Sequence, residues 1–210
     1  MYGRSSLASQ CCVSESLIHY DEVRAGHTFQ EYQDAKNLYK AIETYFSFHP
    51  QTMDLEWIKN VQAAIVGENE KHGFREEDVY IGNLIQATYY PPTYNKLPKL
   101  MEDFEKTLNI NGGGIAQMIN DIVRCHIQFE RIHPFVDGNG RTGRMILNQQ
   151  LVNNGLLPVA ITKKSKYRQA FKLFDRNGDT SLMEHIVLRA QLNAIHQIKT
   201  LVEMKNKSYR

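Results

Sequence analysis

The most constraining feature of this chain is the twelve-residue stretch HPFVDGNGRTGR at residues 133–144, which separates two helical patterns. Glycines on either side of Asn139 let backbone N–H groups approach an anion closely. The helix that we expect to start at about Arg141 adds a favourable dipole at the same place. The stretch therefore predicts a loop and a helix start that hold an anion.

The charged side chains of this stretch are of the kinds that bind a nucleotide phosphate. Arg141 and Arg144 carry guanidinium forks that match phosphate oxygens. Asp137 offers an oxygen ligand to Mg²⁺, which often shares its ligands with phosphates. His133 takes up a proton near neutral pH and can act as a general base. Since no serine or cysteine lies within residues 133–144, the pattern favours direct transfer to an external hydroxyl.

Apolar residues that recur every three or four positions predict helices over most of the chain. Seven helices are expected. The first begins at Phe29 and ends before His49-Pro50, and the second runs from Met53 to about Val66. The others cover 97–108, 115–131, about 141–154, 167–174 and 182–201. Gly67 and Gly155 are expected to end the second and fifth of them.

Residues 78–90 are rich in β-forming residues, and Gly82-Asn83 offers a turn, so we expect a short hairpin closed by Pro91-Pro92. The 210 residues suffice for one domain with a sizeable core. The predicted fold is mainly α, a single-domain helical bundle with one small β-hairpin flap. Its expected parts are an N-terminal arm or short helix (1–28), the helical domain (29–204) and a basic tail (205–210).

Composition and charge narrow the class of protein. The net charge of +2 is too small to indicate a nucleic-acid partner, and no apolar stretch is long enough to span a bilayer. Residues 1–12 lack the apolar segment of a secretory signal. Cys11, Cys12 and Cys125 have no metal-type spacing, which indicates reduced thiols and a cytoplasmic protein. A secreted effector is the alternative, because specialised export leaves no such mark.

Residues 133–144 resemble the signature of the Fic family, H-x-F-x-[D/E]-G-N-G-R-x-x-R, at every fixed position. The resemblance extends from about Val61 to Val187 and includes His126, Pro91-Pro92 and Tyr167. It implies a mostly helical domain with a flap beside the signature, in agreement with the periodicity.

The resemblance also implies an activity, that of a protein adenylyltransferase, which transfers AMP from Mg²⁺-ATP to a Ser, Thr or Tyr hydroxyl of a target protein. It makes His133 the general base and Asp137 the ligand of Mg²⁺. The implied phosphate contacts come from Gly138, Asn139, Gly140, Arg141 and Arg144, with both arginines at the β/γ end. Phe135 is expected to anchor the loop in the core.

Three features outside the signature leave alternatives open. Tyr167 either packs near the adenine base or fills the core. His126 is a buried histidine, a support beneath the active loop, or half of a metal site with His133. The flap segment 84–90 either closes the edge of the bundle or, as in the family, pairs with the backbone of the target protein.

Many members of the family restrain themselves with a helix bearing [S/T]-x-x-x-E-[G/N], whose glutamate pairs with the second signature arginine, here Arg144. Residues 5–10 and 180–185 match this motif only in part, since Ser9 replaces the glutamate and His185 the last position. Restraint by a separate inhibitor protein, an altered segment, or no such restraint are the possible explanations. Alternative functions are use of another nucleotide donor, removal of AMP from a target, and a non-catalytic interaction module.

Overall fold

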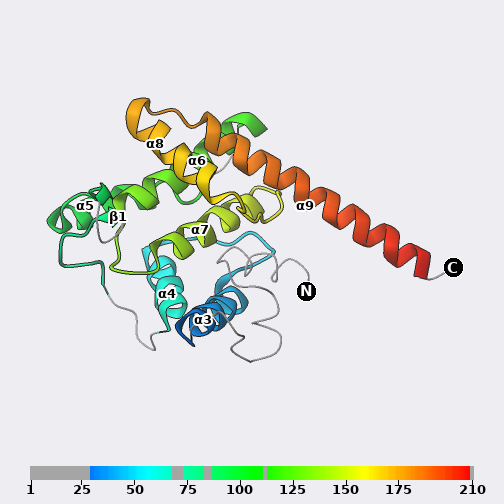
Figure 1. Cartoon of the computed structure of the whole chain (residues 1–210), viewed down its shortest axis with the longest axis horizontal. Coiled ribbons are helices and arrows are strands. Elements are labelled where there is room, and N and C mark those ends of the chain that lie inside the picture. The colour runs from blue at the N-terminus through cyan, green and yellow to red at the C-terminus, as the bar shows by residue number, and fades with distance from the viewer. Residues whose placement is uncertain (1–28, 68–72, 83–86, 111–112, 209–210) are drawn as a thin grey trace.

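A computed structural model describes residues 29–67, 73–82, 87–110 and 113–208 of the chain (Figure 1). The predicted arm at 1–28, Asn83 of the predicted turn, residues 84–86 of the predicted flap and the last two residues of the tail therefore lie outside the described residues. The described helices are α3 (Phe29–Tyr45), α4 (Leu55–Val66), the 3-10 helix η2 (Tyr94–Lys96), α5 (Leu97–Glu105), α6 (Ile115–Ile132), α7 (Asn139–Asn153), α8 (Lys164–Asn177) and α9 (Ser181–Ser208).

The predicted hairpin consists of two short strands, β1 (Ile81–Gly82) and β2 (Ala87–Tyr89), which pair antiparallel. Ile81 pairs with Tyr89 and Gly82 with Ala87, so the register is irregular between the two pairs. The Thr88 hydroxyl donates to the Ile81 carbonyl at 2.9 Å across the strands. The mainly helical fold with one small hairpin is thus confirmed.

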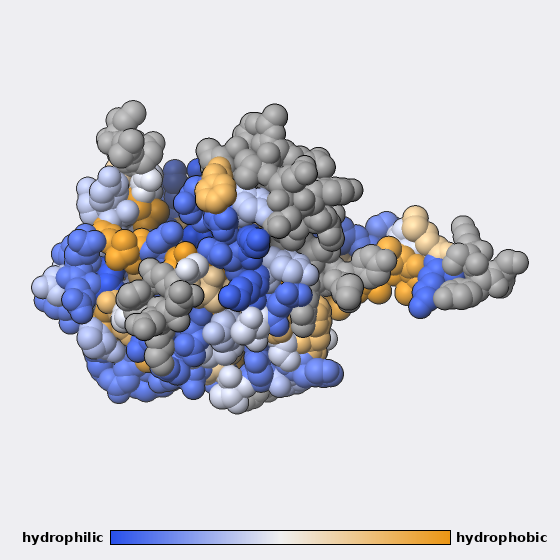
Figure 2. Space-filling view, turned by 90° about the horizontal axis from the view of Figure 1, so that it is seen from below, coloured by the Kyte–Doolittle hydropathy of each residue, from blue (hydrophilic) through white to orange (hydrophobic). Residues whose placement is uncertain are grey.

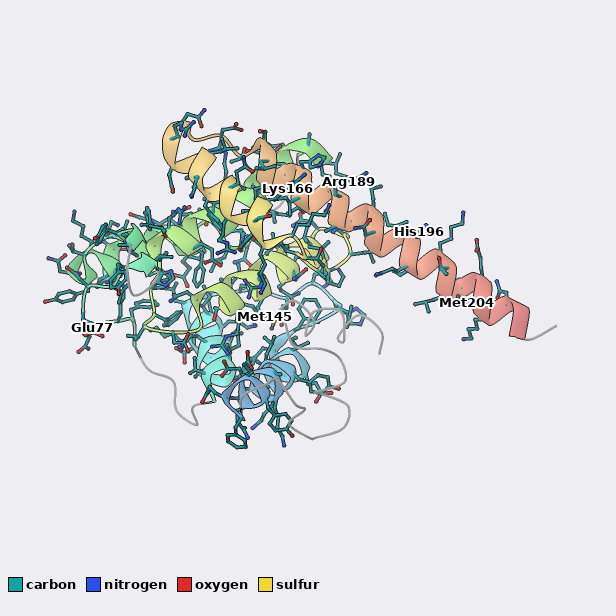
Figure 3. All side chains as sticks on the ribbon, viewed as in Figure 1. Glu77, Met145, Lys166, Arg189, His196 and Met204 are labelled. Atoms are coloured by element: carbon teal, nitrogen blue, oxygen red, sulfur yellow. The ribbon has the colours of Figure 1, made fainter. Side chains whose placement is uncertain are left out.

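Helix α7 lies in the middle of the molecule, with α3 and α4 on one side and α8 and α9 on the other (Figure 1). It supplies residues to all three apolar clusters of the core. Leu147 and Leu151 pack with α6, α8 and α9, Ile146 packs with α5 and α6, and Met145 (Figure 3) packs with α3 and α4. Helix α7 is therefore enclosed by protein, which fixes the signature residues at its start.

Polar residues on this enclosed helix bind backbone groups far away in the sequence. Asn148 accepts from the Val159 N–H at 2.6 Å, Gln149 accepts from the Ser47 N–H at 2.9 Å, and Gln150 donates to the Leu108 carbonyl at 3.0 Å. Buried polar side chains need such partners to be tolerated. These contacts orient α7 against the loops on either side of it.

The ends of the helices differ slightly from the predicted ones. Helix α4 starts at Leu55 rather than Met53, because the Asp54 side chain caps it by accepting from the Trp57 N–H at 2.7 Å. It ends at Gly67, as predicted, where φ is 85° and an added Cβ would lie 2.3 Å from Asn37 Nδ2. Helix α7 starts two residues before the expected Arg141.

The C-terminal part of α9 projects from the body of the molecule (Figure 1) and shows apolar residues along its length (Figure 2). His196 and Met204 lie on this projecting part (Figure 3), and its exposed apolar side chains include Leu192, Ile195 and Ile198. None of the helices in the described ranges is both long and apolar enough to cross a membrane.

Candidate active site

The backbone of His133 ends α6 in the left-handed conformation, with φ 51° and ψ 60°, and its N–H donates to the Phe129 carbonyl at 3.0 Å. No other non-glycine residue in the described ranges has a positive φ. Such strain in a non-glycine residue often marks a functional site. The conformation turns the chain sharply from α6 into the signature loop.

The imidazole of His133 is oriented by one hydrogen bond. Its Nδ1 lies 3.3 Å from the Glu130 carbonyl oxygen, which can only accept, so Nδ1 carries the proton. In the neutral ring, Nε2 then holds the lone pair. Burial lowers the pKa of His133, the positive charges of Arg75 and Arg131 lower it further, and the Glu130 hydrogen bond opposes them. The ring is therefore neutral at pH 7, the form that a general base requires.

Arg75, which no sequence pattern indicated, holds the backbone of this loop. It is 5% exposed, its backbone N–H donates to Pro134 O at 2.9 Å, and its Nε donates to His133 O at 2.9 Å. Its two terminal nitrogens donate to Glu77 O at 2.7 Å and Pro92 O at 2.5 Å. One buried guanidinium thus ties the signature loop to the segments on both sides of the hairpin.

The side chain of Asn139 shapes the loop from within. Its Oδ1 accepts from the Phe135 N–H at 2.9 Å, and its Nδ2 donates to the Phe135 carbonyl at 2.7 Å. The Phe135 ring is buried in the core, as predicted, with its centroid 5.7 Å from that of Phe74. Because the oxygen and the nitrogen of the Asn139 amide are both hydrogen-bonded, the group of Asn139 left for the predicted phosphate contact is its backbone N–H.

Gly138 precedes α7 with φ 81°, a conformation in which a side chain is strained. A Cβ there would also lie 3.1 Å from Val66 Cγ1. The first hydrogen bond of the helix runs from the Thr142 N–H to the Gly138 carbonyl at 2.9 Å. The N–H groups of Asn139, Gly140 and Arg141 therefore precede the intrahelical ladder, and such groups suit an anion.

The predicted metal ligand, Asp137, forms an ion pair with Arg141, a predicted phosphate-binding residue. Its side chain is 75% exposed, and its Oδ2 lies 3.2 Å from Arg141 Nη2. Arg141 Nη1 lies 3.5 Å from Asp34 Oδ2, which is on α3 and was not expected at the site. In the described ranges no three His, Cys, Asp or Glu side chains form a metal-holding group. A single carboxylate suits Mg²⁺ that also binds phosphates and water.

His126 lies fully buried beneath the loop. Its Nδ1 is 3.1 Å from the Gly143 carbonyl and its Nε2 is 2.7 Å from the Tyr167 hydroxyl. Burial lowers the pKa of His126 to about 3, and the Arg144 charge adds to the effect. With both ring nitrogens engaged, His126 is not placed to bind a metal with His133. The contacts match a buried histidine that supports the loop.

Tyr167 packs on the core side of the site. Its ring meets Phe171 edge-on with a centroid distance of 4.9 Å, and its hydroxyl bonds His126. Burial raises the pKa of the Tyr167 hydroxyl, the Glu130 charge raises it further, and Arg144 opposes both. These contacts follow the expectation that Tyr167 fills the core, while its contact with adenine stays a prediction.

The hairpin is attached next to the catalytic loop through Arg131. The guanidinium of Arg131 lies 4.2 Å from the centre of the Tyr89 ring on β2 and 4.7 Å from that of Phe171. Two hydrogen bonds of 2.7 and 2.6 Å join it to the carboxylate of Asp175. Because Arg131 is two residues before His133, the flap and the predicted general base share one support.

The glutamate of the partial restraint motif at 180–185 is bonded to residues outside the signature loop. Glu184 Oε1 accepts from Asn120 Nδ2 and from Thr180 Oγ1, both at 2.6 Å. The bond from Asn120 joins α9 to the N-terminal half of α6. Residues 5–10, the other partial match, lie outside the described residues.

Comparison with known proteins places these observations in a family. Residues 52–151 match the family described as Fic/DOC. The protein adenylyltransferase Fic of Drosophila melanogaster is 40% identical over 102 residues, and that of Drosophila virilis is 39% identical over 102 residues. The aligned part is 48% of this chain and 20% of each relative, so the chain spans about a fifth of the length of the curated relatives it matches.

Solved structures share the fold at low sequence identity. Residues 134–508 of Fic-1 from C. elegans align with a TM-score of 0.71 and 16% identity over 96% of this chain and 62% of that one. A Fic family protein from Desulfovibrio desulfuricans G20 has a TM-score of 0.70 and 21% identity over 93% and 63%. BepC from Bartonella tribocorum, solved with bound AMPPNP, has a TM-score of 0.61 and 17% identity over 75% and 84%.

The described helices therefore have the Fic fold, with the signature loop at the start of α7. Residues 52–151 match the Fic/DOC family within that fold.

Proposed function

We propose that this chain is a protein adenylyltransferase that transfers AMP from Mg²⁺-ATP to a Ser, Thr or Tyr hydroxyl of a target protein. The observation that carries the proposal is the placement of His133, whose Nδ1 lies 3.3 Å from the Glu130 carbonyl oxygen, at the turn that leads from α6 to the N-terminus of α7. The Drosophila relatives are named protein adenylyltransferase Fic, and BepC binds the nucleotide analogue AMPPNP, which supports the proposal.

The reaction follows from this arrangement. The hydroxyl oxygen of the target attacks the α-phosphorus of ATP, and its proton passes to Nε2 of His133. The bond between the α-phosphorus and the oxygen bridging to the β-phosphate breaks, and pyrophosphate leaves with that electron pair. The N–H groups at the start of α7 and the guanidinium of Arg144 balance the negative charge of the phosphates.

Asp137 is the residue that would hold Mg²⁺, because its carboxylate is exposed at the start of α7 and oxygen is the ligand that Mg²⁺ prefers. The bound ion would neutralise charge on the α- and β-phosphates. On binding the ion, Asp137 would give up its ion pair with Arg141. Arg141 remains next to Asp34 and gains phosphate oxygens as new acceptors.

The flap supplies the place for the target. An extended segment of the target adds to the hairpin that contains β2, and its hydroxyl then points toward His133. The stacking of Tyr89 on Arg131 supports this role, because it fixes β2 close to the end of α6.

A labelling experiment tests the activity and the donor together. A cell lysate with Mg²⁺ receives the native chain or the His133→Ala variant, with ATP labelled at the α- or the γ-phosphate. Label from the α-phosphate should appear on protein only with the native chain, and UTP labelled at the same position serves as a donor control. Transfer of γ-label, or equal labelling by the variant, would contradict the proposal.

A further inference from the structure

Glu130 is a buried acid beneath the signature loop that the proposed reaction does not use. It is 9% exposed, and among the described residues its Oε1 has no hydrogen-bond partner. Burial raises its pKa, while the charges of Arg144 and then Arg131 lower it. A buried carboxylate is costly unless a positive charge compensates it. The burial of Glu130 is therefore tolerated because of the nearby positive charges of Arg144 and Arg131.

Two glycines of α7 locate Glu130 relative to Arg144. A Cβ at Gly140 would lie 3.4 Å from Arg144 Nη1 and 3.9 Å from Glu130 Oε1. A Cβ at Gly143 would lie 2.6 Å from the same carboxylate oxygen and 3.1 Å from the Phe129 ring. The acid thus fills the space that the glycines leave on the α6 side of the first turn of α7. The sequence G-R-T-G-R admits both charged groups there.

A second contact reaches Arg144 from α8. The Gly143 carbonyl can only accept, so Nδ1 of His126 carries the proton and Nε2 accepts from the Tyr167 hydroxyl. The lone pairs of the Tyr167 oxygen then accept from Arg144, which hydrogen-bonds this side chain. The hydrogen bonds run in one direction, from Arg144 through Tyr167 and His126 to the backbone of α7.

We propose that Glu130 and Tyr167 are positioning residues, which hold the guanidinium of Arg144 from the core side so that its other N–H groups face the β- and γ-phosphates of ATP. The proposal rests on the proposed function of the site. A guanidinium is a planar fork with five donors, so two of its neighbours can fix its plane while donors remain for the nucleotide. Fixing the fork before binding lowers the entropy lost on binding.

The same geometry argues against Glu130 as a restraint on nucleotide binding. A restraining carboxylate has to occupy the place of a phosphate at the N-terminal end of α7. Glu130 instead lies closest to Gly143, at the end of the first turn of the helix and on the face packed against α6. The Glu130 carboxylate therefore compensates the charge of Arg144 from the α6 side of α7.

The test compares the affinity of two nucleotides for the whole chain by calorimetry. α,β-Methylene-ATP with Mg²⁺ carries β- and γ-phosphates, whereas AMP does not. Glu130→Gln keeps the shape of the side chain and removes its charge, and Tyr167→Phe keeps the ring and removes the hydroxyl. Each should weaken binding of α,β-methylene-ATP roughly tenfold, as expected for loss of one charge-assisted contact, and leave the affinity for AMP unchanged.

Matched controls are Glu102→Gln on α5 and Tyr94→Phe on η2, which should leave both affinities unchanged. In an Arg144→Lys background, Glu130→Gln should have less effect, because the two residues act together. Unchanged binding of α,β-methylene-ATP in both test variants, or an equal loss of AMP binding, would overturn the positioning role. A native chain that binds neither nucleotide would overturn the proposed function as well. If Glu130→Gln does not fold, Tyr167→Phe decides.

Discussion

The buried guanidinium of Arg75 donates to the backbone carbonyl of His133 at 2.9 Å, across 58 positions of sequence. The same side chain donates to Glu77 and Pro92, which lie before and after the hairpin. Arg75 therefore sets the backbone position of His133, the proposed general base, and joins it to the flap. This relationship makes Arg75 a structural requirement of the site although it touches no substrate.

Arg75→Ala should destabilise the domain and reduce transfer. Three backbone carbonyls would lose a charged donor, and each such bond contributes about 1.5–3 kcal/mol, so we expect a loss of roughly 3 kcal/mol or more in the free energy of unfolding. Denaturant unfolding measures it. Arg75→Lys keeps the charge but not the fork, so it should recover only part of the stability. A fully stable Arg75→Ala variant would contradict the role.

The rate of AMP transfer should fall only at acidic pH. His133 must be neutral to accept a proton, and its pKa is lowered from 6.5 mainly by burial, so the neutral form persists below that pH. The value of kcat/KM for ATP should therefore be constant through neutral pH and reach half its maximum below about pH 6.5. A half-maximal rate above this pH would show that His133 is not the titrating base.

Stability should fall over part of the same acidic range because of His126. Its folded pKa of about 3 is below the usual 6.5, so the unfolded chain binds more protons between these values. The free energy of unfolding should thus decrease by up to about 1.4 kcal/mol per pH unit as the pH falls below 6.5. Unfolding measured from pH 7 to pH 5 tests this, and a His126→Gln variant should show a smaller dependence.

Gly143→Ala should destabilise the domain by about 1–3 kcal/mol, the usual cost of inserting a methyl group into a filled space. The new Cβ would meet Glu130 Oε1 at 2.6 Å. Gly140→Ala is the matched control, because its nearest contact is 3.4 Å away at the end of a flexible arginine. Combining Gly143→Ala with Glu130→Ala should cost less than the sum of the two changes. Additive losses would place the clash elsewhere.

Arg131→Ala should raise the KM for the target protein several-fold while the affinity for α,β-methylene-ATP stays the same. The variant removes a cation–π contact to Tyr89 worth about 0.5–2 kcal/mol, and with it the attachment of the flap. Asp175→Asn weakens the hydrogen bonds that hold the Arg131 guanidinium, so it should raise the KM for the target protein by a smaller factor. Equal losses for nucleotide and target would mean that Arg131 supports the whole loop.

Asp137→Asn should raise the Mg²⁺ concentration needed for half-maximal transfer, because an amide oxygen binds this ion less strongly than a carboxylate. Titration of Mg²⁺ at fixed ATP measures the change. Asp34→Asn tests the other carboxylate beside Arg141 and should leave the Mg²⁺ requirement unaltered. The opposite pattern would assign the metal to Asp34.

The positions of the helices, the hairpin and the signature loop could be predicted from sequence, because each is set by neighbouring residues. Periodicity located α3 to α8 to within about three residues, and Gly67 ended α4 as expected, but α9 continues to Ser208, seven residues beyond the predicted end. The start of α7 was placed two residues late, because periodicity does not show that Asn139 already belongs to the helix. The burial of Phe135 also followed from the family pattern.

The support of the site depended on contacts between distant segments. In the sequence, Arg75 and Arg131 look like ordinary surface arginines. The partners of Arg75 are backbone carbonyls, and those of Arg131 are an aromatic ring and an acid 44 positions away. The sequence alone determined which groups are available at residues 133–144. Only the tertiary structure decided that Arg75 holds the backbone of the loop and that Glu130 lies under Arg144. Local patterns encode the order of groups along the chain, whereas burial and charge compensation arise when separate helices pack.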